Sequence, residues 1–334
     1  LMGPRRVGKT VMLIQGIHEL LKDGARPNEI FYVSVDTPVY TGLSLEHLLR
    51  LFMGIHAHNR NKNLYVFFDE IQYLPDWERH LKSLVDSFPQ MRFIASGSAA
   101  AALKLKSQES GAGRFTDLLL PPLVFSEFLH FTGWTIEDSH TLSDLLDEDF
   151  PDIDELNKAF VDYINFGGFP ESVINPEIRK EMNRFVADDI VDKVLLRDIP
   201  SLYGIQDSQE LKRFFTVIAY NTGMEVSFEG LSKSSGIAKN TIRKYLDYLE
   251  AAFLIHRVYR VDQNARRFKR VTHFKVYLSN PCIRSALFGP VTEDSEAMGS
   301  LAETALLCQY GPTIAASMIH YARWSSGEVD MIHL

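Results

Sequence analysis

The sequence has few cysteines, no long hydrophobic run and no excess of positive charge. Cys282 and Cys308 are too few and too far apart for a metal ribbon, and they are typical of reduced thiols in a cytosol. No apolar run approaches the ~20 residues that cross a bilayer, and no signal peptide opens the chain, so we expect a cytoplasmic protein without membrane contact. The net charge of −8 excludes a protein that coats nucleic acid, so any such contact requires a local basic patch.

The remaining composition is that of a globular protein. Hydrophobic residues make up 46% of the chain and charged residues 23%, and a length of 334 residues favours two or three domains. Both ends read as interrupted strands. The strand expected before the first motif is reduced to Leu1 and Met2, and residues 329–334 stop within an expected strand. We therefore expect further residues on both sides.

A phosphate-binding loop opens the chain. Residues 3–10 read Gly-Pro-Arg-Arg-Val-Gly-Lys-Thr, the uninterrupted pattern G-x-x-x-x-G-K-T. Its glycines let backbone N–H groups face a phosphate, Lys9 can reach the β- and γ-oxygens, and the Thr10 hydroxyl can hold Mg²⁺. A helix expected over 11–22, with an apolar stripe, adds the positive end of its dipole. The residues expected to bind the nucleotide are Gly3, Pro4, Arg5, Arg6, Val7, Gly8, Lys9, Thr10 and Val11.

Two adjacent acids follow a second apolar segment. Residues 64–70 read Leu-Tyr-Val-Phe-Phe-Asp-Glu, which predicts a buried parallel strand with carboxylates at its C-terminal tip. Ligands of open α/β sheets bind at that edge. Asp69 is placed to hold Mg²⁺, and Glu70 to polarise the attacking water. The pair favours an ATP-hydrolysing motor or switch over a small-molecule kinase.

These motifs resemble a family of prokaryotic AAA-type ATPases whose members carry a C-terminal, nuclease-like domain of unknown function. Further similar stretches are 32–36, 68–77, 93–98, 112–115, 123–128 and 326–330. The resemblance implies ATP and Mg²⁺ as cofactors and Ser96 as a γ-phosphate sensor, with Ser98 as its rival. It also implies that Arg114 reaches a phosphate in its own or a neighbouring subunit, and that Arg197 is a candidate second sensor. The expected catalytic residues are thus Glu70, Lys9, Arg114 and Ser96.

The fold class expected is α/β. Strands at 30–35, 64–69 and 92–95 alternate with helices at 43–56 and 76–88, and 115–123 is expected to complete a parallel sheet covered on both faces. We assign 1–135 to this P-loop ATPase domain. An acidic stretch at 137–155 reads as a solvated linker or helix face. From 152 to 202 the pattern is helical, broken by Gly167-Gly-Phe-Pro170, and residues 136–206 are assigned to a helical lid.

Residues 207–280 are expected to form a winged helix. A helix–turn–helix pattern spans 229–253 around Gly236, and 252–261 and 271–278 read as the two wing strands. From His256 to Lys275 seven arginines and lysines face one aspartate, a net of +6, which favours contact with DNA over a docking role. Winged helices also mediate protein contacts, and that alternative stays open. The expected DNA-binding residues are Lys239, Asn240, Arg243, Lys244, Arg266, Arg267, Lys269 and Arg270.

Residues 281–334 resemble part of a restriction-endonuclease-like α/β domain. Glu303 on a helix and Asp330 on a strand are candidate metal ligands, with Glu328 as a weaker one. A nuclease of this type also needs a lysine, which we expect on an acid-x-Lys strand that would follow Asp330 beyond residue 334. A nuclease-like fold without nuclease activity is at least as consistent with the sequence.

The reading favoured by the sequence is an AAA-type ATPase that hydrolyses ATP and associates with double-stranded DNA. One alternative is a DNA nuclease gated by ATP. Another is a nucleotide-binding switch or scaffold that acts through a protein partner or as a homo-oligomer and turns over negligibly.

Overall fold

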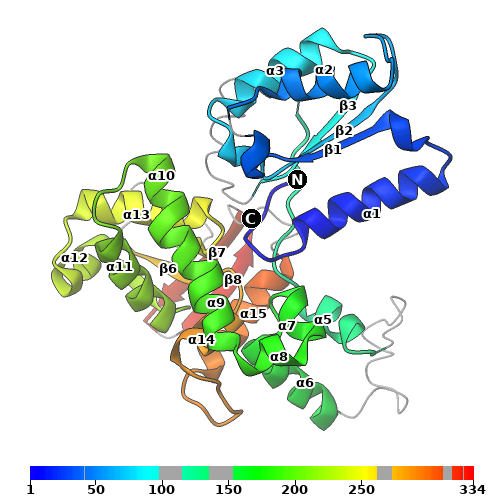
Figure 1. Cartoon of the computed structure of the whole chain (residues 1–334). Helices are drawn as coiled ribbons and strands as arrows, with labels where there is room; N and C mark the ends of the chain where they lie inside the picture. The colour runs from blue at the N-terminus through cyan, green and yellow to red at the C-terminus, as the bar shows by residue number, and fades with distance from the viewer. Residues whose placement is uncertain (41, 98–114, 135–152, 262–272, 311–317, 326) are drawn as a thin grey trace. The chain divides into compact units, whose positions relative to one another are not determined.

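The computed structural model describes residues 1–40, 42–97, 115–134, 153–261, 273–310, 318–325 and 327–334 (Figure 1). These residues form two compact units, Leu1–Leu120 and Pro121–Leu334. The α/β class expected from the sequence is confirmed, with a parallel sheet in the first unit and a mixed sheet in the second. None of the described helices is both long and apolar enough to span a membrane.

A three-stranded parallel sheet organises the first unit. Its strands β1 (Ile30–Ser34), β2 (Tyr65–Asp69) and β3 (Arg92–Ala95) lie in the order β1-β2-β3. Figure 1 shows helix α1 (Lys9–Lys22) on one side of this sheet, and α2 (Leu45–Ile55) and α3 (Trp77–Ser87) on the other. Short 3₁₀ turns η1 (Pro27–Glu29), η2 (Pro38–Tyr40) and η3 (Ile71–Tyr73) join the elements.

Strand β2 is the buried centre of this unit. Val66 and Phe68 are fully buried between the neighbouring strands and helices, as the apolar run in the sequence requires. The apolar face of α3 is buried, including Trp77, Leu81 and Leu84. The apolar stripe expected on α1 is not its buried face: Val11 and Ile14 of that stripe are exposed, and Leu13 is buried instead.

The strand expected over 115–123 is wrong. Among the described residues of that segment, only Leu119 forms a β-bridge, and its partner is Met2, which also bridges to Gly97. The Met2 N–H donates to the carbonyl of Leu118, and the Leu120 N–H donates to the carbonyl of Met2. The segment therefore pairs with the residues before the phosphate-binding loop, as an isolated contact and not as a regular strand.

Helices make up the first part of the second unit. They are α5 (Phe125–Phe131), α6 (Ile153–Phe166), α7 (Pro170–Ile174), α8 (Pro176–Lys180), α9 (Met182–Val186), the π-helical η5 (Ala187–Asp192) and η6 (Val194–Asp198), α10 (Ile199–Tyr203) and α11 (Ser208–Tyr220). The predominantly helical pattern predicted for 152–202 is confirmed over its described residues, 153–202. The Gly167-Gly168 break sits where α6 ends: a side chain at Gly168 would collide with Asn280 and Cys282.

The helix–turn–helix pattern is confirmed in its local geometry. Helix α12 (Phe228–Ser235) ends at Gly236, whose left-handed φ of 74° turns the chain into α13 (Lys239–Ala251). The apolar residues of this segment that pack the pair are buried: Leu231, Ile237, Ile242, Tyr245, Leu246 and Leu249.

A five-stranded mixed sheet closes the second unit, in the order β4-β6-β5-β7-β8. Its strands are β4 (Glu225–Ser227), β5 (Ile255–Val261), β6 (His273–Leu278), β7 (Ile319–Trp324) and β8 (Gly327–His333), with α14 (Cys282–Phe288) and α15 (Met298–Tyr310) between β6 and β7. The expected wing strands β5 and β6 do pair antiparallel, but β5 also pairs in parallel with β7. The segments assigned to 136–206, 207–280 and 281–334 thus belong to one compact unit, and their description as lid, winged helix and nuclease-like domain stays a prediction.

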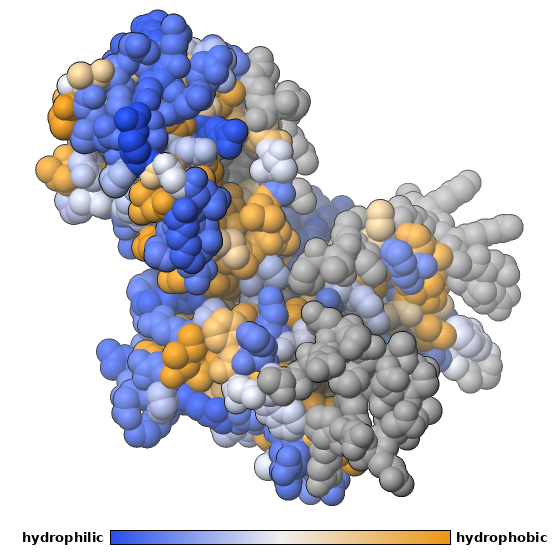
Figure 2. Space-filling view, turned by 90° about the vertical axis from the view of Figure 1, so that its right-hand side faces the viewer, coloured by the Kyte–Doolittle hydropathy of each residue, from blue (hydrophilic) through white to orange (hydrophobic). Residues whose placement is uncertain are grey.

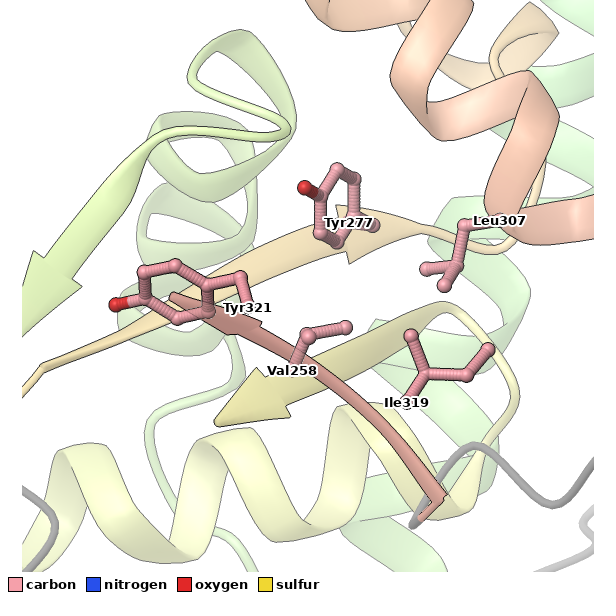
Figure 3. Close-up of a cluster of buried hydrophobic side chains, with 5 residues drawn as sticks. All are labelled: Val258, Tyr277, Leu307, Ile319 and Tyr321. Atoms are coloured by element: carbon pink, nitrogen blue, oxygen red, sulfur yellow. The ribbon is translucent and has the colours of Figure 1, made fainter. Parts of the chain in front are cut away.

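The buried face of this sheet holds a cluster drawn from four elements. Val258 of β5, Tyr277 of β6, Ile319 and Tyr321 of β7 and Leu307 of α15 pack together (Figure 3). The contact of α15 with the sheet therefore joins the segment after residue 281 to the strands before it. Elsewhere hydrophobic residues reach the surface among hydrophilic ones, as Figure 2 shows for one face.

Candidate functional site

The phosphate-binding loop has a backbone that only its glycines allow. A side chain on Gly3 would place its Cβ 2.0 Å from the carbonyl oxygen of Leu120, so the loop passes too close to that segment for any other residue. Gly8 has a φ of 95° and begins α1, which points the helix N-terminus into the loop. Val7 is buried and anchors the loop on the unit.

Lys9 lies inside this loop. Its ammonium donates hydrogen bonds to the carbonyl oxygens of Gly3, at 3.0 Å, and of Pro4. The side chain is buried, and the loop carbonyls compensate the charge. Arg5 points outward, and its guanidinium donates to the Tyr73 hydroxyl at 3.2 Å, linking the loop to the turn after Glu70.

Asp69 joins the loop to the sheet. It ends β2 and is only 1% exposed. Its Oδ2 accepts hydrogen bonds from the Thr10 hydroxyl at 2.7 Å and from the Tyr32 hydroxyl at 3.0 Å. Its Oδ1 accepts from the Ser96 hydroxyl and, at 3.1 Å, from the Glu70 N–H. The loop, β1 and the segment after β3 therefore converge on one buried carboxylate.

Glu70 is held in an unusual backbone conformation. Its φ of 53° and ψ of 41° are left-handed, which costs a non-glycine residue about 1–2 kcal/mol. Ser96 stabilises this turn, because its hydroxyl accepts from the Glu70 N–H at 3.3 Å and its carbonyl accepts from the Ile71 N–H at 2.9 Å. Gln72 Nε2 donates to Glu70 Oε2. Strain of this kind, fixed by neighbours, is typical of functional positions.

Tyr32 donates to the carboxylate from the neighbouring strand. Burial and, after it, the negative charge of Asp69 raise the pKa of Tyr32 to about 12. The phenol therefore stays protonated at neutral pH and remains a hydrogen-bond donor to Asp69.

The donors at this site fit a magnesium ion. Thr10 Oγ1 and the Asp69 carboxylate are oxygen donors in direct contact, and Mg²⁺ is bound in proteins by a few such oxygens together with phosphates and water. Within the described ranges no group of three or more His, Cys, Asp or Glu side chains could hold a metal ion. Thr10 and Asp69 are the residues that would hold Mg²⁺ with a bound nucleotide.

The expected sensor residues lie in different places. Ser96 is buried, and its hydroxyl bonds to the Asp69 carboxylate and the Glu70 N–H, so it stabilises the conformation of these two adjacent acids. Ser98 and Arg114 lie outside the described residues. Arg197 is an exposed residue of η6 in the second unit.

A second cluster of charges surrounds Lys275. Glu303 and Asp330, the candidate nuclease-like ligands, both contact its ammonium, at 3.4 Å and 2.7 Å, and Glu328 does so at 2.8 Å. Tyr277 donates to Glu303 at 3.0 Å. Lys275 is only 5% exposed; burial lowers its pKa, but the contacts with Asp330 and Glu328 outweigh this and raise it.

This arrangement differs from the expected nuclease-like site. Lys275 belongs to β6, between β4 and β5, whereas the acid-x-Lys strand expected after Asp330 would lie beyond residue 334 and stays a prediction. The Lys275 ammonium lies where the carboxylates converge and neutralises part of their charge. The described residues here form an internal ion cluster and do not fit a metal site.

The expected DNA-binding residues are only partly described. Lys239, Asn240, Arg243 and Lys244 all lie exposed on α13. Lys239 is 3.8 Å from Glu229, and the Arg243 guanidinium lies over the Phe228 ring. Arg266, Arg267, Lys269 and Arg270 lie outside the described residues.

Two of the seven basic residues counted toward the basic patch face inward. Arg257 is bound by Glu250 and Asp247, and Lys275 is buried in its carboxylate cluster. The net charge of +6 therefore overstates what this segment presents to solvent.

The comparisons with known proteins agree with the geometry of the first unit. Residues 1–129 match the family model of an AAA domain. This match supports an AAA-type ATPase family for the N-terminal part. Residues 157–294 match a domain of unknown function (DUF8612).

The relatives found among curated proteins are uncharacterized. One from Haemophilus influenzae is 27% identical over 86% of this chain and 68% of its own length. One from Methanocaldococcus jannaschii is 26% identical over 83% of this chain and 59% of its own length. One from Mycobacterium tuberculosis is 24% identical over 99% of this chain and 66% of its own length. The chain thus spans about two thirds or less of the length of most of these relatives.

Sequence reasoning missed Tyr32, Gln72 and Lys275. Lys275 carried a signal, because a lysine inside the apolar strand His-Phe-Lys-Val-Tyr-Leu must find a buried counter-charge. Tyr32 carried none: a tyrosine in a strand is ordinary, and only the register with β2 brings it to Asp69.

Proposed function

We propose that this protein is an AAA-type ATPase that binds and hydrolyses ATP. The observation that carries the proposal is the 2.7 Å hydrogen bond from Thr10 of the phosphate-binding loop to Asp69 at the tip of β2. The two motifs are far apart in the sequence, and this contact supports their joint use in one nucleotide site. The AAA-domain match over residues 1–129 supports the same function.

Each residue has a role that its contacts support. The Lys9 ammonium would exchange the carbonyls of Gly3 and Pro4 for phosphate oxygens, and the N–H groups of the loop would hold the β-phosphate. A bound Mg²⁺ neutralises the charge that develops on the phosphates. Glu70, next to Asp69 and aligned by Gln72, would polarise the attacking water.

Replacing Lys9 tests this proposal. Lys9→Ala removes the cation that reaches the β- and γ-oxygens, so we expect binding of ATP or its turnover to be lost. Phosphate release and the binding of a fluorescent ATP analogue measure the two effects. Lys22→Ala is the matched control, because Lys22 is an exposed residue of the same helix, paired with Glu19. Wild-type turnover by Lys9→Ala refutes the proposal.

We further propose that the second unit associates with DNA. The exposed cations of α13, together with the basic segment 266–270, support contact with phosphates. A protein-partner role remains the alternative, and phosphate release with and without duplex DNA distinguishes the two. Stimulation by DNA favours the DNA role, whereas negligible turnover in both conditions favours a nucleotide-binding switch.

Nuclease activity is not part of the proposal. In the described residues the carboxylates of Glu303, Glu328 and Asp330 are paired with Lys275. An ATP-gated nuclease would need these groups to be released to a metal, and no observation on the described residues supports such a rearrangement.

A further inference from the structure

Asp69 receives hydrogen bonds at both of its oxygens. Ser96 and the Glu70 N–H bind Oδ1, and Thr10 and Tyr32 bind Oδ2. The donors on Oδ1 come from the segment after β3 and from the turn after β2. The two donors on Oδ2 differ in kind, because Thr10 belongs to the phosphate-binding loop and Tyr32 to the neighbouring strand.

The Thr10 hydroxyl has a second role in the proposed function. It is the group of the phosphate-binding loop that holds Mg²⁺ when nucleotide is bound. A metal would take a lone pair of the Thr10 oxygen and leave its single hydrogen free to be donated to Oδ2, so this hydroxyl would serve the metal and the carboxylate at once. Tyr32 is the second donor to Oδ2, and because it lies on β1, outside the phosphate-binding loop, it can orient this oxygen independently of the loop.

The strand register makes a tyrosine necessary at this distance. In the parallel pair β1–β2, Ser34 lies opposite Asp69, and Tyr32 lies opposite Phe67. Tyr32 therefore lies two residues before the position opposite Asp69, which corresponds to about 6.6 Å along the strand. A phenol hydroxyl can span this distance, and a serine or asparagine side chain cannot. The Ser34 hydroxyl, which is nearer, donates instead to Asp36.

We propose that Tyr32 is a positioning residue of the ATP site, which orients Oδ2 of Asp69 toward the magnesium ion of bound MgATP. The inference rests on the proposed ATP site and assigns a residue that neither motif contains. Tyr32 does not touch the reacting atoms in this assignment; it acts through Asp69.

The test is Tyr32→Phe, which removes only the hydroxyl. Tyr65→Phe in β2 is the matched control: the Tyr65 ring carries the Arg92 guanidinium 5.4 Å from its centroid, and phenylalanine retains that contact. Binding of a fluorescent, non-hydrolysable ATP analogue is titrated with Mg²⁺ and, separately, in EDTA. Turnover at saturating ATP is measured against Mg²⁺ concentration, and a melting curve confirms folding.

We expect Tyr32→Phe to raise the half-saturating Mg²⁺ concentration about tenfold, the effect of losing one hydrogen bond to a charged group. Binding in EDTA and the behaviour of Tyr65→Phe should match the wild type. A Mg²⁺ dependence equal to that of the wild type overturns the inference, and so does an equal loss of affinity with and without Mg²⁺, which would indicate a structural role. Failure of the wild type itself to bind the analogue instead refutes the proposed ATP site.

Discussion

Replacing Lys275 with methionine should destabilise the second unit without affecting the nucleotide site. The ammonium contacts Glu303, Glu328 and Asp330 at 3.4, 2.8 and 2.7 Å, and it ties β6 to α15 and β8. Methionine keeps the length and apolar character of the stem, so the substitution removes the charge and leaves the packing largely intact.

The expected magnitude follows from burial. Removing one partner of a buried ion pair costs about 3–5 kcal/mol. Here the side chains of the three acids remain 30–44% exposed, so water replaces part of the lost contacts, and we expect about 2 kcal/mol. For a unit of this size that loss lowers the melting temperature by about 4–8 °C.

Thermal unfolding of the full chain measures the loss, and hydrogen exchange in β6, β8 and α15 localises it. Lys244→Met, at an exposed position of α13, is the control for loss of a lysine. The double variant with Asp330→Asn should be more stable than the sum of the two single changes, because the two groups are in contact. Strict additivity, or a melting temperature unchanged by Lys275→Met, refutes the reasoning.

The pH dependence gives an independent check. Burial lowers the pKa of Lys275, but its contacts with Asp330 and Glu328 outweigh burial, and the net direction is upward. A raised pKa means that the stabilisation is complete below the unfolded value of about 10.4 and is lost as the pH rises above it. The difference between wild type and Lys275→Met should therefore be constant from about pH 7 to 9 and shrink above about pH 10.4.

Three further outcomes are expected. Glu70→Gln should still bind ATP but hydrolyse it more slowly, because Glu70 polarises water and need not hold the metal. Single-turnover phosphate release measures hydrolysis, and a nucleotide-binding titration measures affinity. A fall in ATP affinity as large as the fall in rate would assign Glu70 another role. Gly3→Ala should abolish nucleotide binding because its Cβ meets the Leu120 carbonyl, whereas Gly16→Ala, in open space on α1, should be neutral or stabilising by up to about 1 kcal/mol in a melting experiment. The last prediction concerns charge reversal at Arg266, Arg267, Lys269 and Arg270. It should reduce the slope of log affinity for duplex DNA against log salt concentration by about 3–4 units, while ATP turnover stays intact. An unchanged slope would assign the basic patch a docking role.

The first unit could be predicted well because its determinants are local. The phosphate-binding loop, the apolar strand before Asp69 and the amphipathic helix after Pro75 each carry their signal within about ten residues. The same holds for α12 and α13, whose turn depends on Gly236 alone. The strand expected over 115–123 failed because local composition does not determine which partner a segment pairs with.

The sheet of the second unit and the contacts of Lys275 and Tyr32 depend on pairing between segments that are distant in the sequence. The expected wing strands β5 and β6 were placed correctly, but nothing local to them reports that β7 would pair with β5. The same pairing brings Glu328 and Asp330 to Lys275, a contact that no local sequence pattern predicts. Tyr32 was missed for the same reason, since its role follows from its register with β2.

The parallel pairing of β5 with β7 also has a consequence during synthesis. Tyr259 of β5 must wait for His320, ~60 residues later, before that edge of the strand is covered. Leu278 completes the β5–β6 pair about 40 residues before His320, so at typical translation rates of about 5–20 residues per second the pair spends about 2–8 s with an open edge. Unpaired edges of this kind recruit other strands. A nascent chain of this protein therefore passes through an interval in which association with chaperones, or with other nascent copies, competes with its own folding.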